Sequence, residues 1–246
     1  MFCFKSCILS NTKRFVLLFS LFTFLSVQAE NKSKFHVSLE LSSKYMWRGL
    51  EYGEAPVAFP SIYFNDKGFN AFVMGAYAFD GSHQEVDYGV SYTKGWVTLG
   101  LSDYFFPSAV GEKDNYFDYA SHSTGHSVES YLTIAPTKVP MWLTFSTYLF
   151  GADKKLNGNQ AYSSYVELGY RYDINENNAL SLGMGANLNK SFYTNYEKGF
   201  NVVNIALKYA VNVPIGKSFK LPVSVSYVLN PYKEKSFFTF SMYFNY

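Results

Sequence analysis

Histidine and serine side chains gather in one polar stretch near the middle of the chain. Between residues 118 and 129 it holds His122, Ser123, His126 and Ser127. A histidine within hydrogen-bond reach of a serine hydroxyl can activate that hydroxyl as a nucleophile for hydrolysis. Two histidines can also share a metal ion, but no third ligand is suggested, so that signal is weak. The stretch is therefore compatible with a hydrolytic pair, a weak metal site or an ordinary solvated loop.

Charged residues recur on faces that otherwise carry serine, glycine and asparagine. Five acids and four bases occupy such positions: Glu40, Lys44, Arg48, Glu85, Asp87, Glu129, Glu167, Arg171 and Lys208. If these faces enclose a lumen, the nine residues form a charged constriction that selects small polar solutes. Alternatively, they form ion pairs that brace the wall from inside, since small barrels are filled by their own side chains. Both interpretations require strands that place all nine on one side.

Alternation of apolar and polar residues predicts those strands. In residues 221–229, leucine, valine and tyrosine take every second position, with Ser224 and Ser226 between them. The same period of two runs through residues 162–172, 180–188 and 203–212, and it is typical of strands with two different faces. We predict an all-β fold of twelve antiparallel strands, with ten as the second choice. The predicted ranges are 34–48, 56–65, 68–79, 84–94, 96–106, 126–136, 141–151, 161–173, 178–189, 200–212, 218–229 and 236–246.

The predicted connections mostly alternate between short and long. Every second one is a tight turn rich in glycine, proline, asparagine or aspartate: 65–68, 94–95, 136–140, 173–177 and 213–217. The other set includes the longer polar segments 107–125, 152–160 and 189–199. Outer-membrane barrels have short periplasmic turns and longer outer loops. The pattern therefore predicts a transmembrane up-and-down β-barrel with an even number of strands.

The composition is that of a wall with one face in lipid and the other in water. Aromatic residues make up 20% of the chain and charged residues only 16%, while the mean hydropathy is −0.08. No apolar run after Val27 is long enough for a membrane helix, which needs about 20 residues. A soluble sandwich or ligand-binding barrel also alternates, but its outward face would be polar. Trp47, Trp96 and Trp142 are expected in aromatic girdles at the membrane interfaces.

The first 29 residues have the pattern of a secretory signal peptide. Lys5, Lys13 and Arg14 precede an apolar run, and small or short residues at 27–29 predict cleavage before Glu30. An uncleaved anchor is the alternative, although the run is short for a membrane span. Both cysteines lie within this segment, so residues 30–246, the predicted barrel, have no disulfide. Without the three basic residues of the signal, 18 bases face 19 acids, and no basic stripe predicts nucleic-acid binding.

Residues 42–50, with the sequence SSKYMWRGL, resemble the start of the TorF-type porin family of bacterial outer-membrane proteins. Residues 85–88 and the last hairpin, 221–231 and 237–244, are similar to further parts of that family, although only the first motif is specific. The resemblance implies an outer-membrane barrel with a pore, and it carries over no catalytic or ligand-binding residues. The alternating terminal strand ends on Tyr246 and resembles the strand that the barrel-assembly machinery recognises, although family members often end in phenylalanine.

These observations lead to one expected function and two alternatives. We expect a passive channel for small hydrophilic solutes in the outer membrane of a Gram-negative bacterium. It would contact outer-membrane lipid, bind no nucleic acid, and need no cofactor or metal. The first alternative is a lipid hydrolase, but the known motif, a serine two residues after a histidine, fails because Thr124 follows His122 and Val128 follows His126 at that spacing. The second is a closed structural or surface-binding barrel. The solute and the oligomeric state are not predicted.

Overall fold

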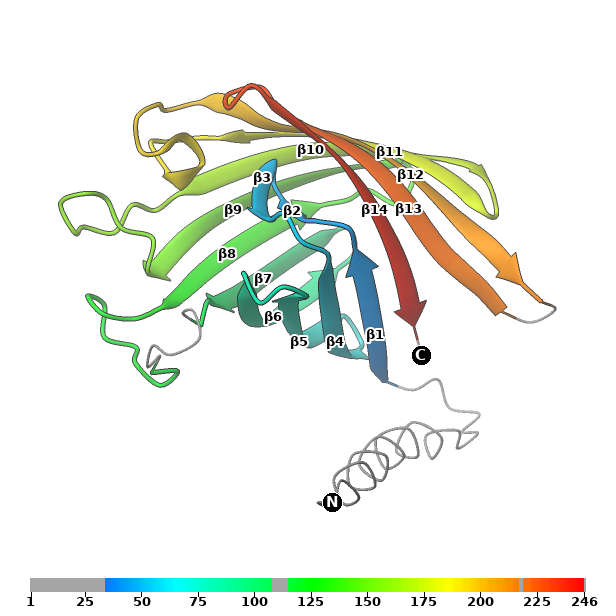
Figure 1. Cartoon of the computed structure of the whole chain (residues 1–246), viewed down its shortest axis with the longest axis horizontal. Coiled ribbons are helices and arrows are strands. Elements are labelled where there is room, and N and C mark those ends of the chain that lie inside the picture. Colours follow the sequence, from blue (N-terminus) through cyan, green and yellow to red (C-terminus); the bar gives the residue numbers. More distant parts are fainter. Residues whose placement is uncertain (1–33, 108–114, 217–218, 246) are drawn as a thin grey trace, which may run out of the picture. The chain divides into compact units, whose positions relative to one another are not determined.

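The computed structural model describes residues 34–107, 115–216 and 219–245. The predicted signal peptide, 1–29, lies outside these residues. Within the described part, twelve strands pair antiparallel with their neighbours in a closed barrel, and two short strands form a separate hairpin (Figure 1). The bounds are β1 Phe35–Ser42, β2 Tyr45–Trp47, β3 Leu50–Gly53, β4 Val57–Asp66, β5 Phe69–Ala78, β6 Gln84–Lys94, β7 Val97–Phe105, β8 His126–Ile134, β9 Met141–Gly151, β10 Ser164–Asn175, β11 Asn178–Asn187, η1 Phe192–Thr194, β12 Asn201–Ile215, β13 Phe219–Asn230 and β14 Lys235–Asn245.

The barrel closes because β1 pairs with both β4 and the last strand, β14. Ser38 to Ser42 of β1 pair with Asn245 to Ser241 of β14, so no strand edge is left open. Closure satisfies the backbone hydrogen bonds of every wall strand, which an open sheet in lipid could not do. The prediction of twelve antiparallel strands is confirmed, and the alternative of ten is excluded.

Register places the apolar positions of neighbouring strands on one outward face. Leu207 of β12 pairs with Leu182 of β11 and Tyr227 of β13. All three remain between 45% and 49% exposed, although burial of such side chains is the usual driving force of folding. Lys208, the next residue, pairs with Ser226 on the inward face. The wall therefore has an apolar outside and a more polar inside, the reverse of a soluble barrel.

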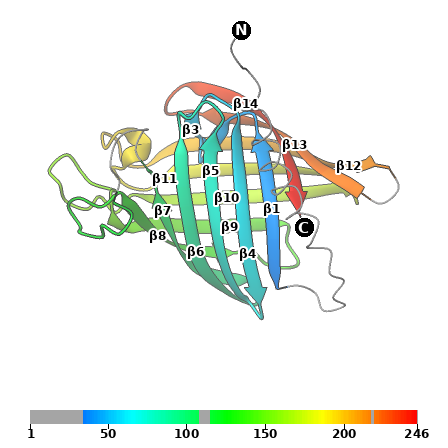
Figure 2. The ribbon, with the colours of Figure 1, turned by 60° about the horizontal axis from the view of Figure 1, so that its bottom comes forward.

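The long connections lie at one end of the barrel and the tight turns at the other, as Figure 2 shows. The first will be called the long-loop end, and among the described residues it holds 106–107, 115–125, 152–163 and 188–200. The second will be called the short-turn end, and left-handed backbone at Lys67, Gly68 and Gly95 closes two of its turns. The alternation predicted from the sequence is confirmed. Among the described residues, no helix is long and apolar enough to span a membrane.

Two predicted strands depart from the expected course for local reasons, whereas the ends of the others shift by at most three residues. The predicted strand 34–48 is wrong beyond Ser42, because the chain leaves the wall there and forms the hairpin β2–β3. Positive φ angles at Arg48 and Gly49 make its tight turn. The proline-containing strand does form, as β4, but its pairing with β5 skips Phe59 and Pro60. Proline has no N–H to donate to a sheet ladder.

Aromatic side chains also occupy the inward face, which corrects the prediction that Trp47 and Trp142 lie in the outer girdles. Trp142 packs over Gly169, where an added Cβ would lie 2.0 Å from the indole ring. Tyr131 covers Gly100 in the same manner. Trp47 belongs to the inner hairpin, so of the three tryptophans predicted in girdles only Trp96 is exposed at a strand end. Glycine on the inward face thus makes room for rings that fill part of the lumen.

Candidate functional site

The hairpin β2–β3, residues 45–53, packs inside the barrel near the long-loop end. Leu50 is buried with Tyr165 of β10, Tyr193 of η1 and Val203 of β12. The Trp47 ring lies 6.0 Å from the rings of Tyr104 and Tyr193, which are far apart in the chain. The hairpin tip is fixed as well, since Asn230 Nδ2 donates to the carbonyl of Gly49 at 3.1 Å. The hairpin therefore acts as a plug, and this name is kept below for residues 45–53.

A buried ion pair ties the plug to the wall. Arg48 donates from Nη1 and Nη2 to the two carboxylate oxygens of Glu129, at 2.6 and 3.0 Å. Such a two-pronged arginine–carboxylate contact is both strong and geometrically specific. The Arg48 and Glu129 side chains are only 15% and 1% exposed, so neither charge has water as a ready alternative partner.

Aromatic residues complete the surroundings of this pair. The Tyr193 hydroxyl accepts from Arg48 at 2.8 Å, and the Tyr104 hydroxyl donates to Glu129 at 3.0 Å. The guanidinium also lies over the rings of Trp47 and Tyr165, at 4.2 and 4.7 Å from their centroids. Cation–π contacts of this kind strengthen where water is excluded. Arg48 is therefore the residue through which the plug is held.

Two further acids of the predicted set are buried beside the plug. Glu85 and Asp87 of β6 are 2% and 1% exposed. His83 Nε2 lies 3.1 Å from Glu85, whereas neither carboxylate oxygen of Asp87 has a hydrogen-bond partner among the described residues. Together with the plug, these residues fill the lumen near the long-loop end.

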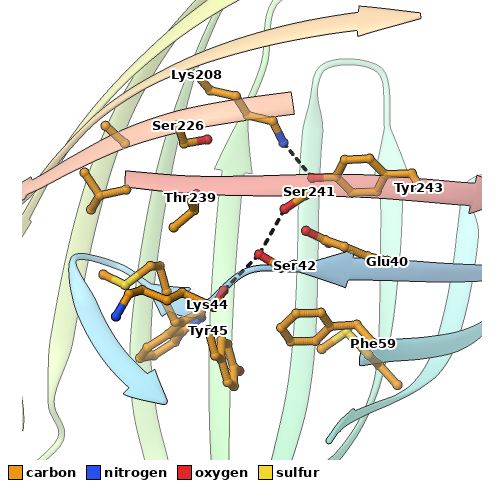
Figure 3. Close-up of a pocket in the computed structure, with 15 residues that line it drawn as sticks. Glu40, Ser42, Lys44, Tyr45, Phe59, Lys208, Ser226, Thr239, Ser241 and Tyr243 are labelled. Atoms are coloured by element: carbon orange, nitrogen blue, oxygen red, sulfur yellow. Dashed lines mark hydrogen bonds between the residues drawn. The ribbon is translucent and has the colours of Figure 1, made fainter. Parts of the chain in front are cut away.

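A cavity of about 320 Å³ lies directly below the plug, toward the short-turn end. Figure 3 shows side chains of β1, β12, β13 and β14 around it, with the plug on one side. Lys208 Nζ of β12 donates to the Tyr243 hydroxyl of β14 at 3.0 Å, across the intervening strand β13. Ser241 donates to Ser42 at 3.0 Å, and Ser42 in turn donates to the carbonyl of Lys44 at 2.9 Å. These hydroxyls connect the cavity wall to Lys44, the residue that directly precedes the plug.

The structure brings seven of the nine predicted charged residues to the plug and its cavity. Arg48 belongs to the plug and Glu129, Glu85 and Asp87 lie beside it, while Glu40, Lys44 and Lys208 line the cavity. Lys44 also forms an ion pair with Glu51 of β3. Lys44 and Arg48 were predicted on the first wall strand, and they lie elsewhere because the chain leaves the wall after Ser42.

The two remaining members of the set lie on β10. Glu167 accepts from the Tyr165 hydroxyl at 2.8 Å and from Asn204 Nδ2 at 3.3 Å. Arg171 lies at the short-turn end, 53% exposed, and pairs with Asp173 at 2.8 Å. A second cavity, of about 540 Å³, is lined there by Arg171, Ala210 and Asn212 among others. The inward face thus carries ion pairs and hydrogen bonds that brace the wall, and it encloses cavities both below the plug and at the short-turn end.

Residues that the sequence did not single out complete both regions. Tyr104, Tyr193, Glu51 and Tyr243 bind the predicted charged groups directly. The alternation of side chains along each strand would have placed Tyr104 and Tyr243 on the inward face. Tyr193 lies in a long loop with no such period.

The histidine-containing stretch lies on the outer side of the wall, apart from the plug. His126 Nδ1 lies 3.0 Å from Asp103 Oδ2, and His126 Nε2 lies 2.7 Å from the carbonyl oxygen of Tyr116. Among the described residues, the ring nitrogens of His126 therefore face a carboxylate and a carbonyl oxygen, and neither forms a hydrogen bond with a serine hydroxyl. Ser127 lies on the opposite, inward face, paired in register with Tyr104. His122 and Ser123 are exposed in the loop.

The described loop segment 115–125 packs over this histidine. The Tyr119 ring stacks on His126 at 4.1 Å, and Tyr88 donates to Asp103 at 2.7 Å. Hydrogen bonds from the Ser123 hydroxyl and the Ala120 amide lower the pKa of the Asp118 carboxyl in the same loop. Asp103 had no place in the sequence-based set, because its strand position is outward. The cluster holds the loop against the wall.

No family model and no curated protein matches this chain. Several solved structures are similar at low identity. The translocator domain of the autotransporter NalP from Neisseria meningitidis is 10% identical over 96% of this chain and 95% of its own, with a TM-score of 0.43. OccK8 (OprE) of Pseudomonas aeruginosa is 11% identical over 89% and 69%, with a TM-score of 0.40. A bacterial polysaccharide outer membrane secretin is 11% identical over 89% and 100%, with a TM-score of 0.39. The closed barrel of this chain is established by its own strand pairing, and no solute or activity follows from similarities at this level.

Proposed function

We propose that this protein is an outer-membrane channel through which small hydrophilic solutes diffuse passively, and that the plug restricts its lumen. The observation that carries this proposal is the charged cavity below the plug, enclosed by a barrel whose outward face is apolar. An apolar outside suits lipid, and a polar, partly unfilled inside suits water and solute. No cofactor is needed for such transport.

The plug makes this channel a restricted one. In the present arrangement Arg48, Glu129 and the surrounding rings fill the lumen near the long-loop end. Passage therefore requires the plug to shift within the barrel. The plug forms a two-stranded sheet of its own, separate from the barrel sheet, so the shift need not disturb the strand pairing of the wall.

The membrane location predicts a large difference between outward and inward arginine substitutions. Leu207→Arg places a charge on the lipid face and is expected to cost about 2–4 kcal/mol of unfolding free energy near mid-membrane. Ala210→Arg, which enters the cavity at the short-turn end, is expected to cost less than about 1 kcal/mol. Urea unfolding of both variants in lipid vesicles measures this. Equal costs would contradict a lipid-facing outer wall.

Single-channel recording in planar bilayers tests the transport function. We expect the refolded protein to show discrete but infrequent current steps. Lys208→Glu is expected to shift the reversal potential in a salt gradient toward cation preference, because it reverses a lumen charge. Lys94→Glu, at the exposed end of β6 on the outward face, is the control and should leave selectivity unchanged. A protein that inserts as a folded barrel and never conducts would favour the closed structural or surface-binding alternative.

A further inference from the structure

Most charged groups of the lumen are already satisfied by the protein itself. Arg48 binds Glu129, Lys44 binds Glu51, and Arg171 binds Asp173. Glu167 receives two hydrogen bonds from neighbouring side chains. Groups paired in this way brace the wall or the plug and are poor candidates for solute recognition, because binding a solute would first cost the existing pair.

Glu40 and Lys208 are different, and both line the cavity below the plug. Among the described residues, Glu40 makes no hydrogen bond or ion pair, and Lys208 has no acidic partner. The Lys208 ammonium donates to the Tyr243 hydroxyl at 3.0 Å and lies 5.1 Å from the centroid of the same ring. One acid and one base are thus available in a single enclosed space.

Tyr243 places the two charges near each other. Glu40 of β1 lies directly opposite Tyr243 of β14 in the strand register, where Cβ atoms are about 5 Å apart. Lys208 reaches the hydroxyl of the same tyrosine from β12. Figure 3 shows Glu40, Tyr243 and the Lys208 ammonium gathered at one side of the cavity. A small molecule that carries an ammonium and a carboxylate on one carbon could contact both groups.

One part of the cavity wall is apolar. Phe59 and Met74 line it from β4 and β5, and Met46 and Trp47 line it from the plug. This surface could pack against an uncharged apolar substituent, which would gain from removal of its surface from water. The polar and apolar parts of the cavity are therefore suited to different ends of one solute.

We propose that this cavity binds zwitterionic solutes of the α-amino acid type with an apolar side chain. The solute carboxylate would accept from Lys208 and its ammonium would donate to Glu40, while its side chain would face Phe59 and Met74. This inference rests on the proposed channel function, because it names the solute class that the lumen favours. Charge-assisted hydrogen bonds supply the specificity, since each is stronger than a neutral one.

Calorimetric titration of the folded full-length barrel in detergent micelles with three related probes tests this. Leucine carries both charges, leucinamide only the ammonium, and N-acetyl-leucine only the carboxylate. We expect leucine to bind at least about tenfold more tightly than either analogue, because each analogue lacks one charge-assisted contact. Equal affinities for the three probes, or no binding of any, would overturn the proposal.

Two variants assign the contacts. Lys208→Met is expected to weaken leucine about tenfold and to leave leucinamide unchanged, because leucinamide has no carboxylate. Glu40→Gln should weaken leucine similarly and leave N-acetyl-leucine unchanged. Lys235→Met, outside the cavity, is the control, and a loss of leucine binding as large as that of Lys208→Met would also overturn the proposal. Heat-dependent mobility on gels checks that each variant folds.

Conductance measured on the same preparations separates the two proposals. A protein that conducts but binds the three probes equally loses the zwitterion site and keeps the channel. A protein that binds leucine selectively but never conducts keeps the binding site and loses the channel.

Discussion

Glu129→Ala is expected to destabilise the barrel by about 3–5 kcal/mol and to raise the fraction of time the channel is open at least about tenfold. The substitution leaves the Arg48 guanidinium buried without its carboxylate, which is the costly way to break a buried pair. Arg48 can regain hydration only if the plug leaves its seat. If about 1.4 kcal/mol of this cost favours the displaced plug over the seated plug, the ratio of displaced to seated molecules rises tenfold. Denaturant unfolding and single-channel recording measure the two effects.

Two companion variants make this result specific to the buried pair. Asp173→Ala also removes the acid partner of an arginine, but that pair is exposed, and exposed pairs contribute about 0–1 kcal/mol. The double variant Arg48→Met, Glu129→Leu replaces the pair with apolar side chains and should recover most of the stability. If Asp173→Ala and Glu129→Ala open the channel equally, Arg48 does not hold the plug.

Gly49→Ala is expected to displace the plug tip and to lower the unfolding free energy by at least about 2 kcal/mol. Gly49 has a φ of +78°, and an added Cβ would lie 2.0 Å from the backbone oxygen of Val203. Val203 is a bulge residue of β12, but its neighbours Val202 and Asn204 both pair with β11, so its backbone is held on either side. The tip must therefore lift, which also breaks the Asn230 hydrogen bond to Gly49. More frequent and larger current steps should accompany the loss of stability.

Gly53→Ala is the matched control within the same hairpin. Gly53 does not have a positive φ angle, and its nearest neighbour to an added Cβ is 3.9 Å away. Its replacement should change stability by less than about 0.5 kcal/mol and leave the current unchanged. Equal behaviour of the two alanine variants would show that the tip is not seated against β12 as described.

The wall of the barrel was predictable because its information is local. Each strand carries a period of two, and each turn carries the glycine, proline or asparagine that its backbone requires. Residues 201–215 illustrate this, since their alternation continues past the predicted end at 212 to Ile215 in β12. The same parity correctly predicts that Glu85, Asp87, Glu129 and Lys208 lie on the inward face of the barrel.

The plug was not predictable from the same signals. Residues 43–48 alternate well enough to extend the first strand, and the reversal depends on the left-handed backbone of Arg48 and Gly49. Arginine does not require that conformation, so its sequence position carries no clear turn signal. What stabilises the reversal is contact with Tyr104, Glu129, Tyr165 and Tyr193, which only the closed barrel brings within reach.

The amino-acid sequence alone determined an all-β chain of twelve antiparallel strands, with one apolar face and one face that holds the charges. These features follow from side-chain period and turn chemistry, which act over a few residues. Only the tertiary structure decided which charges are paired and which remain available in the cavity. Arg48 and Glu129 are 81 residues apart, and such a separation in the sequence does not indicate that two residues are in contact. Their pairing, and the freedom of Glu40 and Lys208, arise because closing the barrel sets the distance between strands that the sequence leaves unrelated.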